Sequence, residues 1–225
     1  MISHKHKCIF VHIPKTAGSS INRYISGGKI FDWKTPNYEV LYGYCPKRQI
    51  HLQHATVKQL LETELISEDL FNTYFKFTFI RNAWDRSYSD YHWMMNDTGI
   101  KDNFENFINK SGRFTKVLND NSTKYFRGDH LLNQSDFFDT SGSSKLDFVG
   151  SFENISEDLL FVLNRIGASS EKDYHEKKNT KKRSHVYKFY NRKRYNLVKS
   201  AYKKDIDTFG FDFKIKSCFE RALIF

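Results

Sequence analysis

Two short segments carry residues that suit phosphate binding, and the first is His12 to Ser20 (HIPKTAGSS). It follows an apolar run and precedes a segment of helical character. In such a strand–loop–helix unit, the N–H groups at the start of the helix and the helix dipole both favour an anion. Gly18 lets the backbone approach a ligand closely. The side chains that add a cation or a hydroxyl donor are Lys15, Thr16, Ser19 and Ser20.

The second segment is Arg81 to Ser89 (RNAWDRSYS), directly after another apolar run. An arginine at the end of a strand can form a bidentate contact with a phosphate. Ser89 lies about two helical turns further on, so it can return to the same side of the site. Taken singly, Arg81 also suits a surface ion pair, and Ser89 also suits a solvent-facing helix position. The pair is informative mainly in combination with the first segment.

Apolar runs alternate with helical patterns along the chain. The expected strands are residues 7–13, 74–80 and 146–149. Helices are expected from Ile21, after a capping box formed by Thr56 and Gln59 and continuing through Leu65, over the last part of residues 81–95, and after an N-cap at Ser156. This order predicts an α/β fold, a parallel sheet flanked by helices, with its site at the carboxyl ends of the strands.

Composition and charge favour one domain over residues 1–225 and an anionic partner. The chain has 225 residues and 16% aromatics, which supply enough apolar surface for one core. Residues 171–204 hold thirteen Lys or Arg and three Asp or Glu, an excess that equals the formal net charge of +10. Such a cluster concentrates anions, although it also suits a solvated helix face.

The three cysteines, Cys8, Cys45 and Cys218, form no disulfide framework and no CxxC pair. The N-terminal apolar run is too short for a signal peptide, and no apolar run reaches the length of a membrane span. We therefore expect a cytoplasmic protein without an integral membrane segment. Its oligomeric state is not predicted.

Four segments together resemble one family. FVHIPKTAGSSI and FIRNAWDRSYSDY are similar to the 5′-phosphosulfate and 3′-phosphate motifs of carbohydrate sulfotransferases of the heparan 2-O and chondroitin/dermatan type, and of bacterial sulfotransferase family 2 relatives. LDFVGSFENISEDL and YKKDIDTFGFDF resemble later segments of that family, so the resemblance extends from residue 9 to about residue 213. One departure is Ala83, where the family usually has proline; this change removes no ligand group.

The resemblance implies a P-loop-NTPase-like sulfotransferase fold and a bacterial origin. It also implies transfer of a sulfonate group from 3′-phosphoadenosine-5′-phosphosulfate (PAPS) to a carbohydrate hydroxyl. The product would be adenosine 3′,5′-bisphosphate (PAP), and no metal would be required. The acceptor would be a glycan, with acidic glycans among the candidates. The residues implied to hold the 5′-phosphosulfate are Lys15, Thr16, Ala17, Gly18, Ser19 and Ser20, and those implied to hold the 3′-phosphate are Arg81 and Ser89.

Sulfonate transfer needs a base for the acceptor hydroxyl and positive charge on the departing phosphate oxygen. Lys15 is the predicted stabiliser of that oxygen. A histidine is the natural base, because its ordinary pKa of about 6.5 leaves it largely neutral at cellular pH. His54 matches the position of a histidine in related sulfotransferases and is the predicted base, with His51 as the reserve. No neighbouring cysteine or carboxylate completes a metal set with these two histidines in the sequence.

The basic stretch corresponds to a loop that closes over the nucleotide in related enzymes. Lys181, Arg183 and Ser184 are the candidates for that role. The same stretch could instead line the groove for an acidic acceptor.

Two other functions fit parts of the sequence. A nucleotide-dependent small-molecule kinase of related fold would need a Walker A loop, GxxxxGK[ST], and this pattern does not occur in the chain. A nucleic-acid-binding module could use the basic segment with its interleaved tyrosines. The two phosphate-binding segments favour the sulfotransferase over both, with no nucleic-acid partner.

Overall fold

The computed structural model describes residues 1–139, 145–169 and 184–213. Its main sheet has four strands in the order β1-β2-β5-β6. Their bounds are β1 Ile2–Ser3, β2 Cys8–Phe10, β5 Phe75–Ile80 and β6 Phe148–Ser151. β5 pairs in parallel with both β2 and β6, as the order of elements predicted, and β1 pairs antiparallel with β2 at one edge. The α/β class is confirmed.

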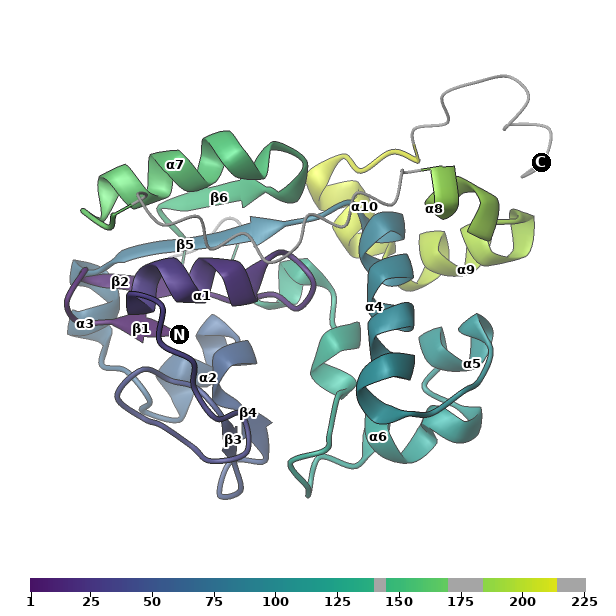
Figure 1. Cartoon of the computed structure of the whole chain (residues 1–225), viewed down its shortest axis with the longest axis horizontal. Helices are drawn as coiled ribbons and strands as arrows, with labels where there is room; N and C mark the ends of the chain where they lie inside the picture. Colours follow the sequence, from purple (N-terminus) through teal and green to yellow (C-terminus); the bar gives the residue numbers. More distant parts are fainter. Residues whose placement is uncertain (140–144, 170–183, 214–225) are drawn as a thin grey trace.

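The alternation of side chains along β2 gives the sheet two apolar faces. Cys8 and Phe10 point to the face covered by helices α1 (Gly18–Ser26) and α7 (Ile155–Arg165). Ile9 and Val11 point to the opposite face, which packs against α2 (Val57–Glu62) and α3 (Glu68–Thr73). The sheet is therefore a central layer with helices packed on both faces (Figure 1). This packing fixes the positions of the strand ends.

A third cluster of apolar residues lies beyond the carboxyl end of β5 and is built from helices (Figure 1). Its longest member is α4 (Ala83–Thr98), which starts directly after β5 and buries Trp84 and Met94. The neighbouring helices are α5 Phe104–Ile108, α6 Thr115–Asn119, α8 Ser184–Phe189, α9 Arg192–Ala201 and α10 Lys203–Phe209. These helices therefore lie next to the carboxyl end of β5.

Short elements connect the layers. A hairpin of β3 (Tyr44–Cys45) and β4 (Ile50–His51) leads directly into the 3-10 turn η1 (Leu52–His54). The other 3-10 turns are η2 Gly112–Phe114, η3 Gly128–Leu131, η4 Gln134–Asp136 and η5 Phe152–Asn154. The sequence pattern predicted neither the hairpin nor η1.

The capping box at the start of α2 is present as predicted. The Gln59 backbone N–H donates to Thr56 Oγ1 (3.1 Å), and the Thr56 backbone N–H donates to Gln59 Oε1 (2.9 Å). The helix ends at Glu62, earlier than the predicted Leu65, because Glu64 adopts a left-handed conformation (φ 55°) that a helix cannot continue.

The predicted N-cap of α7 at Ser156 is wrong. The helix begins at Ile155, and its N-cap is Asn154, because the turn η5 runs straight into it. Strand limits also differ: the first buried strand is limited to β2, and β6 starts two residues after Leu146 and continues to Ser151. These shifts move element ends and leave the order of elements unchanged.

Candidate active site

The loop between β2 and α1 is wound tightly and leaves the start of α1 open to an anion. Lys15 and Ala17 both have positive φ (70° and 72°), a conformation that non-glycine residues rarely adopt and that is concentrated at ligand sites. Ala17 is the N-cap of α1 but makes no side-chain capping bond, and the first turn carries no acidic residue. The N–H groups that begin a helix are therefore not satisfied by a cap here.

Gly18 is required by its close contact with His12. A Cβ atom built on Gly18 would lie 1.7 Å from Nε2 of His12. The His12 ring occupies this space, stacks on Phe10 (5.4 Å between centroids) and meets His54 edge-on (4.9 Å). The loop and the predicted base are thus linked through His12.

Arg81 follows β5 and reaches the same loop from the neighbouring strand. Its guanidinium NH1 donates to the Lys15 carbonyl oxygen (3.0 Å), and it stacks on the Phe152 ring at 4.0 Å. Its Nε is buried and has no hydrogen-bond partner among the described residues. An arginine held in this way keeps donor capacity for an anion in the cavity.

These groups line one cavity of about 530 Å³ at the carboxyl ends of β2 and β5. The predicted site residues found in its lining are Lys15, Ala17, Gly18, Ser19, Ser20, His51, His54, Arg81 and Ser89. Thr16 is the exception, because its side chain is fully buried and its hydroxyl donates to the Ile13 carbonyl oxygen (2.8 Å). The Thr16 hydroxyl therefore supports the loop, and its predicted contact with the phosphosulfate stays a prediction.

The predicted nucleotide-covering residues cannot be placed in this cavity. Lys181 and Arg183 lie outside the described residues. Ser184 is the first residue of α8, and the position of its side chain is not described.

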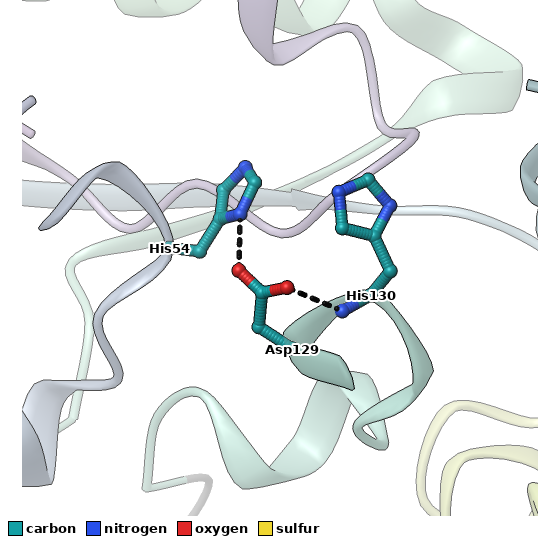
Figure 2. A group of neighbouring side chains, drawn as sticks. All are labelled: His54, Asp129 and His130. Atoms are coloured by element: carbon teal, nitrogen blue, oxygen red, sulfur yellow. Dashed lines mark hydrogen bonds and ion pairs between the residues drawn. The ribbon is translucent and has the colours of Figure 1, made fainter. Parts of the chain in front are cut away.

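His54 is hydrogen-bonded to a carboxylate that comes from a distant part of the sequence. His54 Nδ1 lies 2.6 Å from Asp129 Oδ2, and the two side chains are 11% and 12% exposed (Figure 2). Burial lowers the pKa of His54, and the charge of Asp129 opposes part of that fall. Burial, the largest single effect, would raise the pKa of Asp129, but the hydrogen bond from His54 and the neighbouring His54, His130 and His51 together hold that pKa below its ordinary value. The pair is a neutral imidazole beside a carboxylate at neutral pH.

A second carboxylate–histidine pair lies next to the first. His130 Nδ1 donates to Asp90 Oδ1 (2.8 Å), and the His130 ring stacks on Trp93 with centroids 4.5 Å apart and planes 4° from parallel. The Lys15 ammonium lies over the same Trp93 ring, 5.0 Å from its centroid. Burial lowers the pKa of Lys15, which Asp90 partly opposes. The loop between β2 and α1 and the two histidines therefore share one wall.

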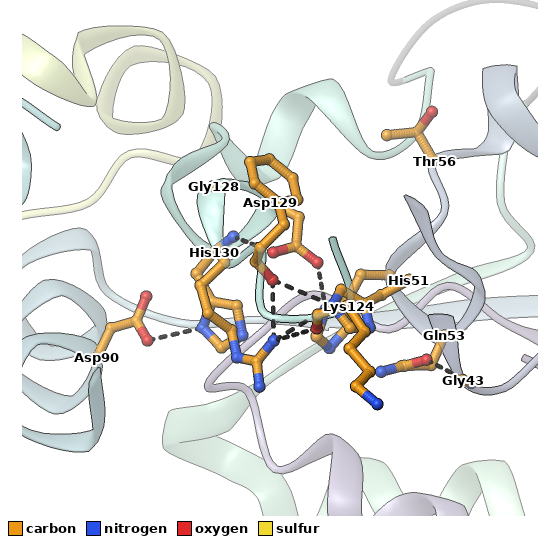
Figure 3. A network of polar contacts seen from close by, with 12 residues as sticks. Gly43, His51, Gln53, Thr56, Asp90, Lys124, Gly128, Asp129 and His130 are labelled. Carbon is orange, nitrogen blue, oxygen red and sulfur yellow. Dashed lines mark hydrogen bonds and ion pairs between the residues drawn. The ribbon is translucent and has the colours of Figure 1, made fainter. Parts of the chain in front are cut away.

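His51 is held differently from His54. Its Nε2 donates to the Phe126 carbonyl oxygen (3.0 Å), and Figure 3 shows it within the same polar network. Burial lowers the pKa of His51 to about 4. The nitrogen that could accept a proton, Nδ1, is buried without a partner among the described residues. His54 has the carboxylate partner that His51 lacks at this nitrogen.

The far wall of the cavity carries an aromatic ring and an ion pair. The Arg127 guanidinium lies over the Trp33 ring at 4.7 Å, and its Nε donates to Asp97 Oδ2 (3.1 Å). Arg127 NH1 also donates to the carbonyl oxygens of Lys124 (3.0 Å) and Phe126 (2.9 Å). Trp33, Asp97 and Arg127 all line the cavity.

In the sequence no nearby carboxylate completes a metal set with His51 and His54, but the fold brings Asp129 next to His54. One ligand-type atom from each of His54, Asp129 and His130 lies within 4.8 Å of the others. Such a group has the donor types of a metal site. In the structure, however, His54 and Asp129 use these atoms to bond directly to each other, as a base and an orienting carboxylate do.

Sequence reasoning missed several residues that line or support the cavity: Trp33, Asp90, Trp93, Asp97, Arg127, Asp129 and His130. A signal existed for part of this group. Asp90 and Trp93 follow Ser89 on a helix that the pattern predicted, and Asp90 and Trp93 are three positions apart, so they share a face. Asp129 and His130 had no comparable local signal.

The sulfotransferase family model matches residues 1–212, which is nearly the whole chain. The chain belongs to the sulfotransferase family. Searches of curated proteins and of solved structures gave no match. The α/β sheet with parallel strands and flanking helices agrees with this family, and sulfonate transfer is the activity of its members. Within the described part of this sulfotransferase, the helices are too short or too polar to cross a membrane.

Proposed function

We propose that this sulfotransferase moves the sulfonate group of PAPS to a carbohydrate hydroxyl, with His54 as the base. The observation that carries the proposal is the meeting of three kinds of group in one cavity. An uncapped helix start and two cations, Lys15 and Arg81, suit a nucleotide with separate phosphate groups. A neutral histidine lies beside them, where an acceptor hydroxyl could be deprotonated.

The two phosphate sites follow from the two strands. Lys15 and the N–H groups at the start of α1 would hold the 5′-phosphosulfate, with Ser19 and Ser20 as additional donors. Arg81 and Ser89 would hold the 3′-phosphate, which distinguishes PAPS from ordinary adenine nucleotides.

The reaction would be an in-line displacement at sulfur. The acceptor oxygen forms a bond to sulfur while the bond from sulfur to the 5′-phosphate oxygen breaks. His54 takes the hydroxyl proton, and Lys15 stabilises the negative charge that develops on the departing phosphate oxygen. The products are the sulfated acceptor and PAP, and no metal enters the balance.

The far wall of the cavity suits a sugar. Trp33 offers an aromatic ring beside the polar groups of Gln53 and Arg127. A few polar groups next to aromatic surface are typical of small-molecule sites. Two lysines lie near this wall, outside the cavity lining: Lys34 lies 5.5 Å from the centroid of the Trp33 ring, and Lys124 lies 5.7 Å from that of Tyr125, which itself packs edge-on against Trp33. An acidic glycan would fit this wall.

The proposal is tested by sulfonate transfer itself. The purified protein is incubated with PAPS labelled with ³⁵S at sulfur and with a set of neutral and acidic polysaccharides, without added metal. We expect label to enter a polysaccharide and PAP to form in equal amount. Transfer to a phenol or amine supplied as an alternative acceptor, with none to any carbohydrate, would contradict a carbohydrate as the acceptor. Absence of all transfer would contradict PAPS as the donor.

A further inference from the structure

We propose that Asp129 is the positioning residue of the His54 base: it accepts the Nδ1 proton of His54, turns the Nε2 lone pair toward the acceptor, and stabilises the imidazolium formed when the hydroxyl proton is taken. The inference rests on the proposed function of His54. It adds a residue that the sequence reading did not contain and that acts through another side chain.

The geometry fixes which nitrogen carries the proton. An ionised carboxylate is an acceptor only, so the 2.6 Å contact between His54 Nδ1 and Asp129 Oδ2 requires the proton on Nδ1. Nε2 then keeps its lone pair. A base must have this nitrogen free of a proton, and without a fixed partner the two tautomers of imidazole would both be populated. Asp129 therefore selects the tautomer that can act.

Asp129 is itself held by both oxygens. Oδ2 accepts from His54, and Oδ1 accepts from the backbone N–H of His130 (3.1 Å), as Figure 2 shows. The His130 side chain is in turn fixed by Asp90 at 2.8 Å and by stacking on Trp93. Asp90 and Trp93 both belong to α4, so the carboxylate is tied to the longest helix of the structure. A carboxylate with few alternative positions can orient an imidazole precisely enough for proton transfer.

The charges around the pair explain why a carboxylate is needed there. The titratable groups that face His54 and Asp129 are His12, His51, His130, Lys110 and Arg127. All five are bases, and two of them are permanently or usually cationic. These groups would repel an imidazolium formed on His54. The negative charge of Asp129 is therefore the main interaction that stabilises the protonated state of His54.

The first test is the Asp129→Asn variant, which keeps the shape of the side chain and removes its charge. We expect kcat to fall by between about 10² and 10⁴-fold, as found when orienting carboxylates are replaced elsewhere. The acid limb of the kcat–pH profile should also move to lower pH, because loss of a neighbouring negative charge lowers the pKa of His54. Affinity for PAP should change by less than about twofold, because Asp129 touches no group assigned to the nucleotide.

The matched control is Asp120→Asn, which removes the same charge from a half-buried residue outside the cavity lining, whose carboxylate accepts from Ser122. This control should leave both kcat and the acid limb unchanged. A merely structural role of Asp129 would lower kcat without moving the acid limb relative to wild type. That result, or an Asp129→Asn variant with wild-type kcat, would overturn the proposal.

The second test needs neither the Asp129→Asn variant nor a measurement of activity. In ¹⁵N-histidine-labelled wild-type protein, the ring nitrogens of His54 are assigned by comparison with His54→Gln. We expect a protonated Nδ1 and an unprotonated Nε2 at pH 7.5. The opposite tautomer, or a mixture of both, would overturn the proposal. If wild-type protein lacked all PAPS-dependent transfer, the proposed function would fail, whereas the tautomer would still report on Asp129 separately.

Discussion

In the proposed mechanism, some single residues of the cavity hold an anion and others move a proton, and substitution can separate the two. Lys15 and Arg81 carry fixed positive charge, whereas His54 is neutral and has a carboxylate at its back. A residue of the first group should affect binding of the nucleotide. A residue of the second should affect turnover at saturating nucleotide.

His54→Gln should reduce kcat by about 10²- to 10⁴-fold, the usual contribution of a general base. Affinity for PAP should stay near wild type, because the glutamine amide can still donate to Asp129 and keep it in place. Turnover and calorimetric binding are measured on the same preparation. His51→Gln is the comparison, and a larger loss of kcat in that variant than in His54→Gln would make His51 the base.

Arg81→Ala should weaken PAP binding by about 10- to 100-fold, the range expected when a hydrogen bond to a charged group is lost. Binding of adenosine 5′-phosphosulfate, which lacks the 3′-phosphate, should change much less. Both ligands are titrated into wild type and variant. Equal losses for the two ligands would show that Arg81 does not read the 3′-phosphate.

The residues on strand ends could be predicted from the sequence, and the residues behind them could not. Lys15 and Arg81 follow strands that the pattern revealed, and parallel strands bring their carboxyl ends together. Asp129 lies 75 positions after His54 and reaches it from a short 3-10 turn. No periodicity or spacing connects such a pair. The chemical roles of Lys15, Arg81 and Ser89 stay predictions.

At the level of elements, the position of His54 depends on how α2 begins. His54 ends η1, and only Ala55 separates it from the capping box at Thr56. The cap fixes the direction in which the chain enters the helix, so it also limits the position of the histidine. Damage to this cap should reach the site, whereas damage to a distant cap should not.

Thr56→Ala should lower the free energy of unfolding by about 1 kcal/mol and also lower kcat. Ser67→Ala is the matched control, because Ser67 Oγ caps α3 by accepting from the Leu70 N–H (3.2 Å) far from the cavity. It should lower stability by a similar amount with kcat unchanged. Urea denaturation and turnover are measured for both. Equal effects of the two variants on kcat would contradict a link between the α2 cap and the site.

Element order was easier to predict than element ends. The strand–loop–helix units around β2, β5 and β6 were predicted because apolar β-branched and aromatic runs stand between turn residues. β1 and the β3–β4 hairpin were missed, since two-residue strands give no alternation to detect. The start of α7 was misplaced because the 3-10 turn η5 runs directly into the helix, so Asn154 and not Ser156 is the N-cap.

For the molecule as a whole, the buried histidines predict how stability depends on pH. Burial lowers the pKa of His12, His51 and His54 below the ordinary value of 6.5, to about 4 for His51. Below pH 6.5 the unfolded chain therefore binds more protons than the folded chain. The contribution of these neutral histidines to the free energy of unfolding should be fully present above that pH. The free energy of unfolding should fall between pH 6.5 and 4, by up to about 1.4 kcal/mol per pH unit for each histidine.

Urea denaturation at pH 7.5 and pH 5.0 measures this dependence. We expect a lower free energy of unfolding at pH 5.0. The difference between the two pH values should be smaller in His51→Gln, which removes one of the titrating groups. Equal stability of the wild-type protein at the two pH values would show that these histidines are not buried in their neutral form.

The structure describes only part of the basic stretch, residues 171–204. The basic stretch continues through α8 and α9, but its earlier part lies outside the described residues. Its role toward nucleotide or acceptor stays a prediction. The same holds for the single domain over residues 1–225, for the cytoplasmic location and for the bacterial origin.

The central claim is that the cavity reads a nucleotide with both a 5′- and a 3′-phosphate. It is tested most directly by calorimetric titration of the protein with adenosine 3′,5′-bisphosphate beside ADP, without metal. We predict micromolar binding of the bisphosphate and little binding of ADP, because Arg81 and Ser89 line the same cavity as Lys15 and the start of α1. Equal binding of both nucleotides, or binding of neither, would contradict it.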